Sequence, residues 1–77
     1  MDTMNVVETI SSDVFKRITL ISMPERDSYF YVHDVLNEDG GLEERWIQDW
    51  NCLDITDEMS SSLRSEMYNF VDNFYKK

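Results

Sequence analysis

VFKRITLISM at Val14–Met23 and YFYVHDVL at Tyr29–Leu36 are the two most strand-like segments of this 77-residue chain. Both are rich in β-branched and aromatic residues, which pack well on a pleated surface. The residues between them, PERDS at 24–28, are typical of a turn because proline and aspartate favour turn conformations. Two strands so close in sequence predict an antiparallel hairpin.

Successive side chains of a strand point to opposite faces, so the second segment has two distinct sides. One side carries Phe30, Val32, Asp34 and Leu36. The other carries Tyr29, Tyr31, His33 and Val35. If Phe30 and Val32 point into the core, the tyrosines point outward. Tyrosine tolerates water and offers contact area, so this side is a candidate surface for a partner or a second copy. Tyrosine is also common on ordinary solvated strands, which is the alternative.

NEDGG at residues 37–41 predicts a second turn, because glycine readily adopts positive φ angles. The segment that follows has two interpretations. Leu42, Trp46, Trp50 and Leu53 recur at spacings of 4, 4 and 3, which suits a helix. An Asp-Gly-Gly turn between two apolar segments favours a hairpin instead. We therefore expect a third antiparallel strand at about residues 44–50, with a helix as the alternative.

The C-terminal segment has the clearest helical pattern, with apolar residues recurring on one side of a helix. These residues are Met59, Leu63, Met67, Phe70, Val71 and Phe74. Thr56 is the expected N-cap, and Asp57 and Glu58 follow it where the helix dipole favours negative charge. Lys76 and Lys77 suit the opposite end. The pattern predicts an α-helix over about residues 57–75.

These segments together predict an α+β fold in one domain, residues 1–77. The expected architecture is a small three-stranded antiparallel meander, with the C-terminal α-helix packed on one face and a short N-terminal element. The first residues fit a short helix through Met4, Val7, Ile10 and Val14, and fit a strand less well. A chain this short buries only about 60% of its unfolded surface, so we expect dimerisation or partner binding to assist its stability.

Negative charge is concentrated in the middle of the chain. The formal net charge is −9, from sixteen acidic and seven basic residues. Nine of the acids fall between Asp34 and Glu58, where Arg45 is the only base. Large apolar residues alternate with these acids, and tryptophan is a frequent energetic anchor at interfaces. The segment predicts a docking surface for a basic partner. The alternative is a solvated acidic surface that serves solubility.

The candidate partner-binding residues fall into three groups. The charged groups are Asp34, Glu38, Asp39, Glu43, Glu44, Asp49 and Asp54. The candidate anchors are Trp46 and Trp50, and the candidate tyrosine contacts are Tyr29 and Tyr31.

The sequence has no pattern typical of catalysis or of a cofactor site. His33 and Cys52 are its only histidine and cysteine, too few for a four-ligand zinc site, and we interpret them as a strand-surface residue and a half-buried thiol. An EF-hand centred on Gly40 would place Val35 and Trp46 where oxygen ligands are needed. We therefore expect no enzymatic activity, no cofactor and no metal.

Several features favour a location in the cytoplasm. A single cysteine suits a reducing compartment. The acidic N-terminus lacks the apolar region of a signal peptide, and no apolar segment approaches the length of a membrane span. The net negative charge disfavours direct binding to nucleic acid or to anionic lipid, because phosphates would repel it.

The sequence-based hypothesis is a small acidic inhibitor that occupies the basic, nucleic-acid-binding surface of a larger host enzyme such as a defence nuclease. Its carboxylates would replace the phosphates that lysine and arginine normally contact. Its size, acidity and low cysteine content are typical of phage-encoded anti-defence factors, which act in the host cytoplasm. One alternative is an immunity-type partner that binds by shape, through the tyrosine side or the C-terminal helix. Another is a homo-oligomeric structural module, such as a homodimer, without inhibitory activity.

Overall fold

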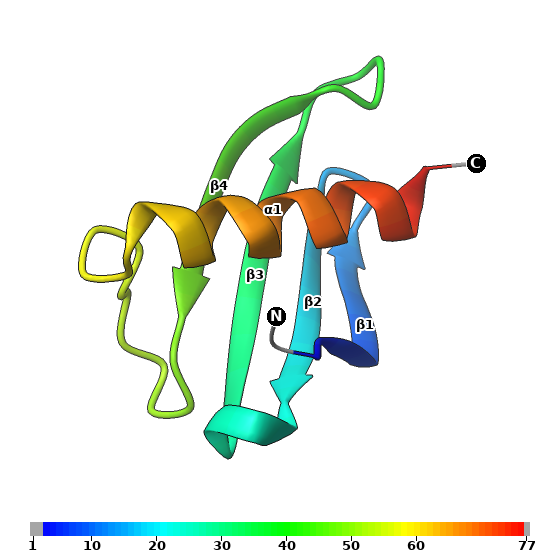
Figure 1. Cartoon of the computed structure of the whole chain (residues 1–77). Coiled ribbons are helices and arrows are strands. Elements are labelled where there is room, and N and C mark those ends of the chain that lie inside the picture. Colours follow the sequence, from blue (N-terminus) through cyan, green and yellow to red (C-terminus); the bar gives the residue numbers. More distant parts are fainter. Residues whose placement is uncertain (1–2, 77) are drawn as a thin grey trace.

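The computed structural model describes residues 3–76, apart from the side chain of Ser12. It contains a four-stranded antiparallel sheet in the order β1-β2-β3-β4, and one helix that runs across one face of the sheet (Figure 1). The strands are β1 (Asn5–Asp13), β2 (Lys16–Met23), β3 (Ser28–Leu36) and β4 (Leu42–Gln48), and the helix is α1 (Ser61–Tyr75). A short 3-10 helix, η1 (Pro24–Arg26), joins β2 to β3. The predicted α+β class is confirmed.

The number of strands predicted from the sequence is wrong by one, because the N-terminal element is the strand β1. This strand pairs with β2 from Asn5 opposite Ser22 to Asp13 opposite Lys16, with irregularities between Val6 and Glu8 and between Ser11 and Asp13. The neighbouring strand β2 supplies the backbone hydrogen bonds that hold β1 extended. The spacing of apolar residues in the N-terminal segment is a local pattern and contains no information about pairing with β2. For this reason the pattern suggested a short helix.

The core lies between α1 and the face of the sheet that α1 covers. Ile21 and Met23 of β2, Val32 of β3, Ile47 of β4 and Val71 of α1 are fully buried there. Burial of each such side chain contributes about 1.5–3 kcal/mol. Phe30 is also buried, which confirms that this side of β3 faces inward. The tyrosine side therefore lies on the opposite face of the sheet, here called the outer face.

The third predicted strand is confirmed as β4, and the helical alternative for that segment is not observed. The helix begins four residues later than predicted, at Ser61, with Ser60 as its N-cap. The hydroxyl of Ser60 accepts a hydrogen bond from the backbone N–H of Leu63 at 3.2 Å. Thr56, the predicted N-cap, is held elsewhere, because its hydroxyl accepts from the backbone N–H of Ile47 at 2.8 Å. The predicted Lys77 contribution lies outside the described residues, and Lys76 is the C-cap.

Candidate protein-interaction surface

Asp34 does not lie on the surface. Its side chain is fully buried under α1, where Oδ2 accepts a hydrogen bond from Nε of Arg17 at 3.0 Å. Oδ1 accepts from Nε of Arg45 at 2.6 Å. A carboxylate enclosed by two guanidinium groups cannot contact another protein directly. Asp34 therefore belongs to the interior, unlike the other acids of the predicted set.

Arg45 also lies on the inner side of the sheet, with 6% of its side chain exposed. Its Nη2 approaches Oδ1 of Asp72 on α1 at 2.9 Å. Burial opposes the charge of this guanidinium, but the hydrogen bonds and attraction of Asp34 and Asp72 outweigh burial, and the pKa of Arg45 is raised. Arg45, the only base of the acidic segment, is therefore paired with Asp34 and Asp72. It does not neutralise the other acids of that segment.

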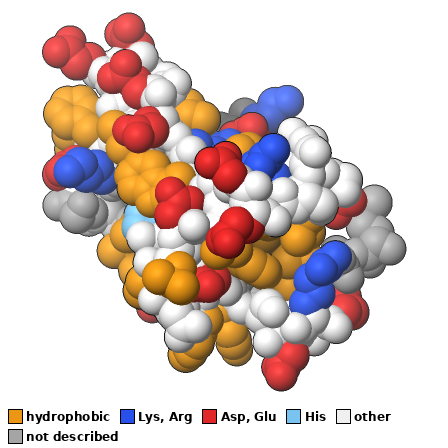
Figure 2. All heavy atoms as spheres, turned by 90° about the vertical axis from the view of Figure 1, so that its left-hand side faces the viewer, with side chains coloured by type: hydrophobic (Ala, Val, Ile, Leu, Met, Phe, Trp, Pro, Cys, Tyr) orange, Lys and Arg blue, Asp and Glu red, His pale blue; other side chains and the backbone are white. Residues whose placement is uncertain are grey.

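The remaining acids of the segment lie in the turn before β4, on β4 itself and in the segment between β4 and α1, and we call them the acidic edge. They are Glu38, Asp39, Glu43, Glu44, Asp49, Asp54, Asp57 and Glu58. Figure 2 views the molecule from this side, and acidic side chains are spread over the face with hydrophobic side chains between them. Lys and Arg side chains also appear at intervals, so the negative charge is interrupted. The acidic edge therefore alternates charge with apolar contact area.

The first acids of the acidic edge lie in the hairpin turn between β3 and β4. Asn37 holds this turn, because its side-chain oxygen accepts hydrogen bonds from the backbone N–H groups of Asp39 at 2.9 Å and Gly41 at 2.8 Å. Gly40 adopts a φ of +84°, which favours glycine. The turn exposes Glu38 and Asp39 at its tip. Their positions are therefore set by a defined turn.

The next acids of the acidic edge, beyond those of β4 itself, lie in the loop that follows β4. Oδ1 of Asp49 accepts from the backbone N–H groups of Asn51 at 2.8 Å and Leu53 at 3.0 Å. Oδ1 of Asp54 accepts from the backbone N–H of Thr56 at 3.0 Å and from its hydroxyl at 2.6 Å. These hydrogen bonds lower the pKa of Asp54. Both acids thus shape the loop as well as carrying charge.

The outer face of the sheet is aromatic beside the acidic edge. Its rings come from Tyr29, Tyr31, His33, Trp46 and Trp50. His33 stacks on Trp46, with ring centroids 5.0 Å apart and planes 7° apart. Nε2 of His33 also lies 2.7 Å from Oε1 of Gln48. The helix covers the opposite face, and Figure 1 shows no other described segment over this one.

Tyr29 and Trp50 are brought together from segments that are distant in sequence. Their ring centroids lie 5.4 Å apart, and 42% of Tyr29 and 64% of Trp50 are exposed. Asp27, the residue directly before β3, lines the same pocket as these two rings, and no sequence pattern marked it as a candidate. No local sequence pattern predicts that Tyr29 and Trp50 lie close together, because their contact depends on where β4 ends beside β3.

Within residues 3–76, no three His, Cys, Asp or Glu side chains gather in a group that could hold a metal ion. No helix of the same residues has both the length and the apolar character needed to cross a membrane. The chain has no significant match among protein-family models, curated proteins or solved structures. Arguments about function therefore rest on the surface itself.

Proposed function

We propose that this chain is a small binding protein that docks its acidic edge on the basic surface of a larger protein. A nucleic-acid-handling enzyme, such as a defence nuclease, is the partner whose chemistry fits best. The carboxylates would occupy positions that phosphates otherwise take, and the chain would inhibit the enzyme by blocking them. A phage-encoded inhibitor acting in the host cytoplasm has this character.

One observation carries the proposal. The acidic edge has eight acids, and Arg45, the only base of the same segment, forms ion pairs with Asp34 and Asp72 instead of with them. Because its only base faces inward, this segment has a net negative field, which the Lys and Arg side chains on the same side of the molecule interrupt (Figure 2). Such a field accelerates encounter with a positive partner and disfavours like-charged partners. The exposed Trp50 and Leu53, at 64% and 62%, add apolar contact area among the charges.

The proposal is tested by capture on the immobilised chain from a host-cell lysate, followed by elution with duplex DNA or with salt. We expect the captured proteins to bind nucleic acid and to be released by DNA competition. Raising the salt from about 0.1 M to about 1 M shortens the Debye length from about 10 Å to about 3 Å, so it should release them too.

Two double variants with equal loss of charge make the test specific. Glu43→Gln with Glu44→Gln removes two charges from the acidic edge, and we expect it to weaken capture. Glu8→Gln with Glu66→Gln removes two exposed charges from β1 and α1, and we expect it to have little effect. Equal capture by both double variants at a low salt concentration of about 0.1 M, where surface charges are least screened, would refute a role for the acidic edge.

The uncovered outer face favours a second candidate function, binding by shape. A partner or a second copy of the chain would then contact the aromatic rings, with charge secondary. Tyr31→Ala would abolish this binding, whereas high salt would leave it intact. Sedimentation of the free chain distinguishes a second copy from a different partner protein, because self-association needs no other protein.

A further inference from the structure

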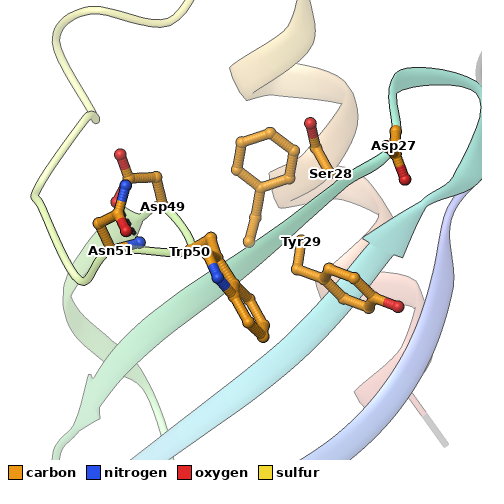
Figure 3. Close-up of a pocket in the computed structure, with 7 residues that line it drawn as sticks. Asp27, Ser28, Tyr29, Asp49, Trp50 and Asn51 are labelled. Carbon is orange, nitrogen blue, oxygen red and sulfur yellow. Dashed lines mark hydrogen bonds between the residues drawn. The ribbon is translucent and has the colours of Figure 1, made fainter.

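A notch opens at the end of the sheet where β4 is shorter than β3. The last residue pair between these strands is Tyr31 with Gln48, so Ser28, Tyr29 and Phe30 have no β4 residue beside them. The chain turns away at Asp49 and leaves a pocket of about 350 Å³ between residues 27–30 and residues 49–51 (Figure 3). We call this pocket the notch.

Two aromatic side chains form one wall of the notch. Figure 3 shows Trp50 and Tyr29 reaching it from the loop and from β3. Their rings are tilted by 42° to each other, and both remain substantially exposed. An aromatic face attracts a cation placed over it, and tryptophan does so most strongly. This wall therefore suits a flat or cationic group.

Two carboxylates flank the same pocket. Asp27 and Asp49 line it, and no Lys or Arg is among the described residues that do. Asp49 uses Oδ1 for the backbone of the loop, and its Oδ2 has no partner among the described residues. The carboxylate of Asp27 likewise has no hydrogen bond or ion pair to them. The notch is thus negative as well as aromatic.

The backbone of Tyr29 adds a donor and an acceptor. Along an antiparallel strand, the N–H and C=O groups of successive residues alternate between the two neighbouring strands. The N–H and C=O of Ile47 bond away from β3, to Thr56 and Ile55. The paired residues Gln48 and Tyr31 therefore bond to each other. Two residues earlier on β3, Tyr29 directs its own N–H and C=O to the side where β4 has ended.

From this combination we infer that the notch receives an arginine side chain of the partner. A guanidinium is planar, stacks on aromatic rings and presents five N–H donors to carboxylates and carbonyls. An ammonium is a compact, strongly hydrated charge that gains less from the aromatic wall. The inference deepens the proposed function, on which it rests, because a basic partner surface supplies the arginine.

The inference is tested by titrating the isotope-labelled full chain with acetyl-arginine-amide and following its NMR spectrum. We expect saturable shifts of the Trp50 indole N–H and of the backbone at residues 27–30 and 49–51, while the Trp46 indole serves as the internal reference. Trp50→Phe assigns the indole signal. The neutral analogue acetyl-citrulline-amide, at matched ionic strength, should leave the notch unshifted.

Conservative variants locate the contribution of each group. Asp49→Asn keeps the oxygen that accepts from Asn51 and Leu53, and Asp27→Asn keeps a residue type that tolerates its positive φ of 51°. Each should weaken acetyl-arginine-amide binding, and Trp50→Ala should weaken it about two- to fivefold. Glu66→Gln, which removes an exposed charge of α1 outside both the notch and the acidic edge, should not.

The outcomes separate this inference from the proposed function. Specific shifts at the notch without any salt-sensitive partner in the capture experiment would support the arginine site and reject the proposed function. Equal shifts with citrulline, or shifts spread over the acidic edge without preference for Trp50, would overturn the arginine site whatever the capture experiment shows.

Discussion

Nε of Arg45 donates a 2.6 Å hydrogen bond to Oδ1 of Asp34, whose side chain is fully buried. The same carboxylate accepts from Arg17, so its removal would leave two guanidinium groups partly buried without their shared counter-charge. Breaking a buried ion pair by removing one partner costs about 3–5 kcal/mol. We therefore expect Asp34→Asn to lower the free energy of unfolding by about that amount, measured by urea denaturation.

An exposed acid of the same segment provides the control for Asp34. Asp39 lies at the tip of the β3–β4 hairpin, and Asp39→Asn should change the stability by less than about 0.5 kcal/mol. If the Asp34→Asn chain is too unstable to fold, a natural osmolyte that strengthens burial should restore its folding before the comparison is made. Equal stability of the two variants would contradict a structural role for Asp34.

Tyr75 anchors the C-terminal end of α1 to the sheet. Its hydroxyl lies 2.7 Å from Oγ1 of the buried Thr19, and the guanidinium of Arg17 lies 3.7 Å from the centre of its ring. Tyr75→Phe keeps the ring but leaves the Thr19 hydroxyl without this partner, so we expect a loss of about 1–2 kcal/mol in thermal or urea unfolding.

Tyr68 is the matched position on the same helix. Its ring lies 5.1 Å from the guanidinium of Arg45, and its hydroxyl makes no hydrogen bond to another described residue. Tyr68→Phe should therefore have little effect on stability. A similar loss in both variants would mean that the Thr19 contact contributes nothing specific.

The sequence predicted the parts of the fold that depend on local pattern. Alternation along β3 placed Phe30 and Val32 inside and the tyrosines outside, as the structure has them. The same alternation put Asp34 on the inner side, but charge alone kept it among the surface candidates. Its burial depends on Arg17 and Arg45, which meet it only across neighbouring strands.

The parts that the sequence did not predict depend on contacts between distant segments. The predicted start of α1 was wrong because Thr56 and Ser60 are both residue types that cap helices. In the structure, the hydroxyl of Thr56 bonds to Ile47 of β4, and Ser60 caps the helix. The notch was missed for the same reason. Tyr29 and Trp50 approach each other only because β4 stops at Gln48, and no spacing in the sequence records that end.

Asp54 gives the stability of the chain a defined dependence on pH. Hydrogen bonds from Thr56 lower its pKa in the folded state. A carboxylate with a lowered folded pKa contributes stability above its unfolded pKa, and that contribution is lost as the pH falls through the folded value. Between near-neutral pH and about pH 3, we expect the urea midpoint of the wild-type chain to fall more than that of Asp54→Asn. Asp57→Asn, at a position whose carboxylate makes no hydrogen bond to a described residue, should follow the wild type.

Met67 is, with Val71, one of the two buried residues by which α1 contributes to the core. Its side chain is fully buried against the sheet, whereas Phe74, on the same helix, is 49% exposed. Truncation of a buried methionine removes its transfer free energy and leaves a cavity, so Met67→Ala should cost about 2–5 kcal/mol. Phe74→Ala deletes a larger side chain but opens little buried space, so its cost should be smaller. Urea denaturation of the two variants distinguishes these expectations. A larger loss for Phe74→Ala would mean that the exposed end of α1, and not the sheet face, holds the helix in place.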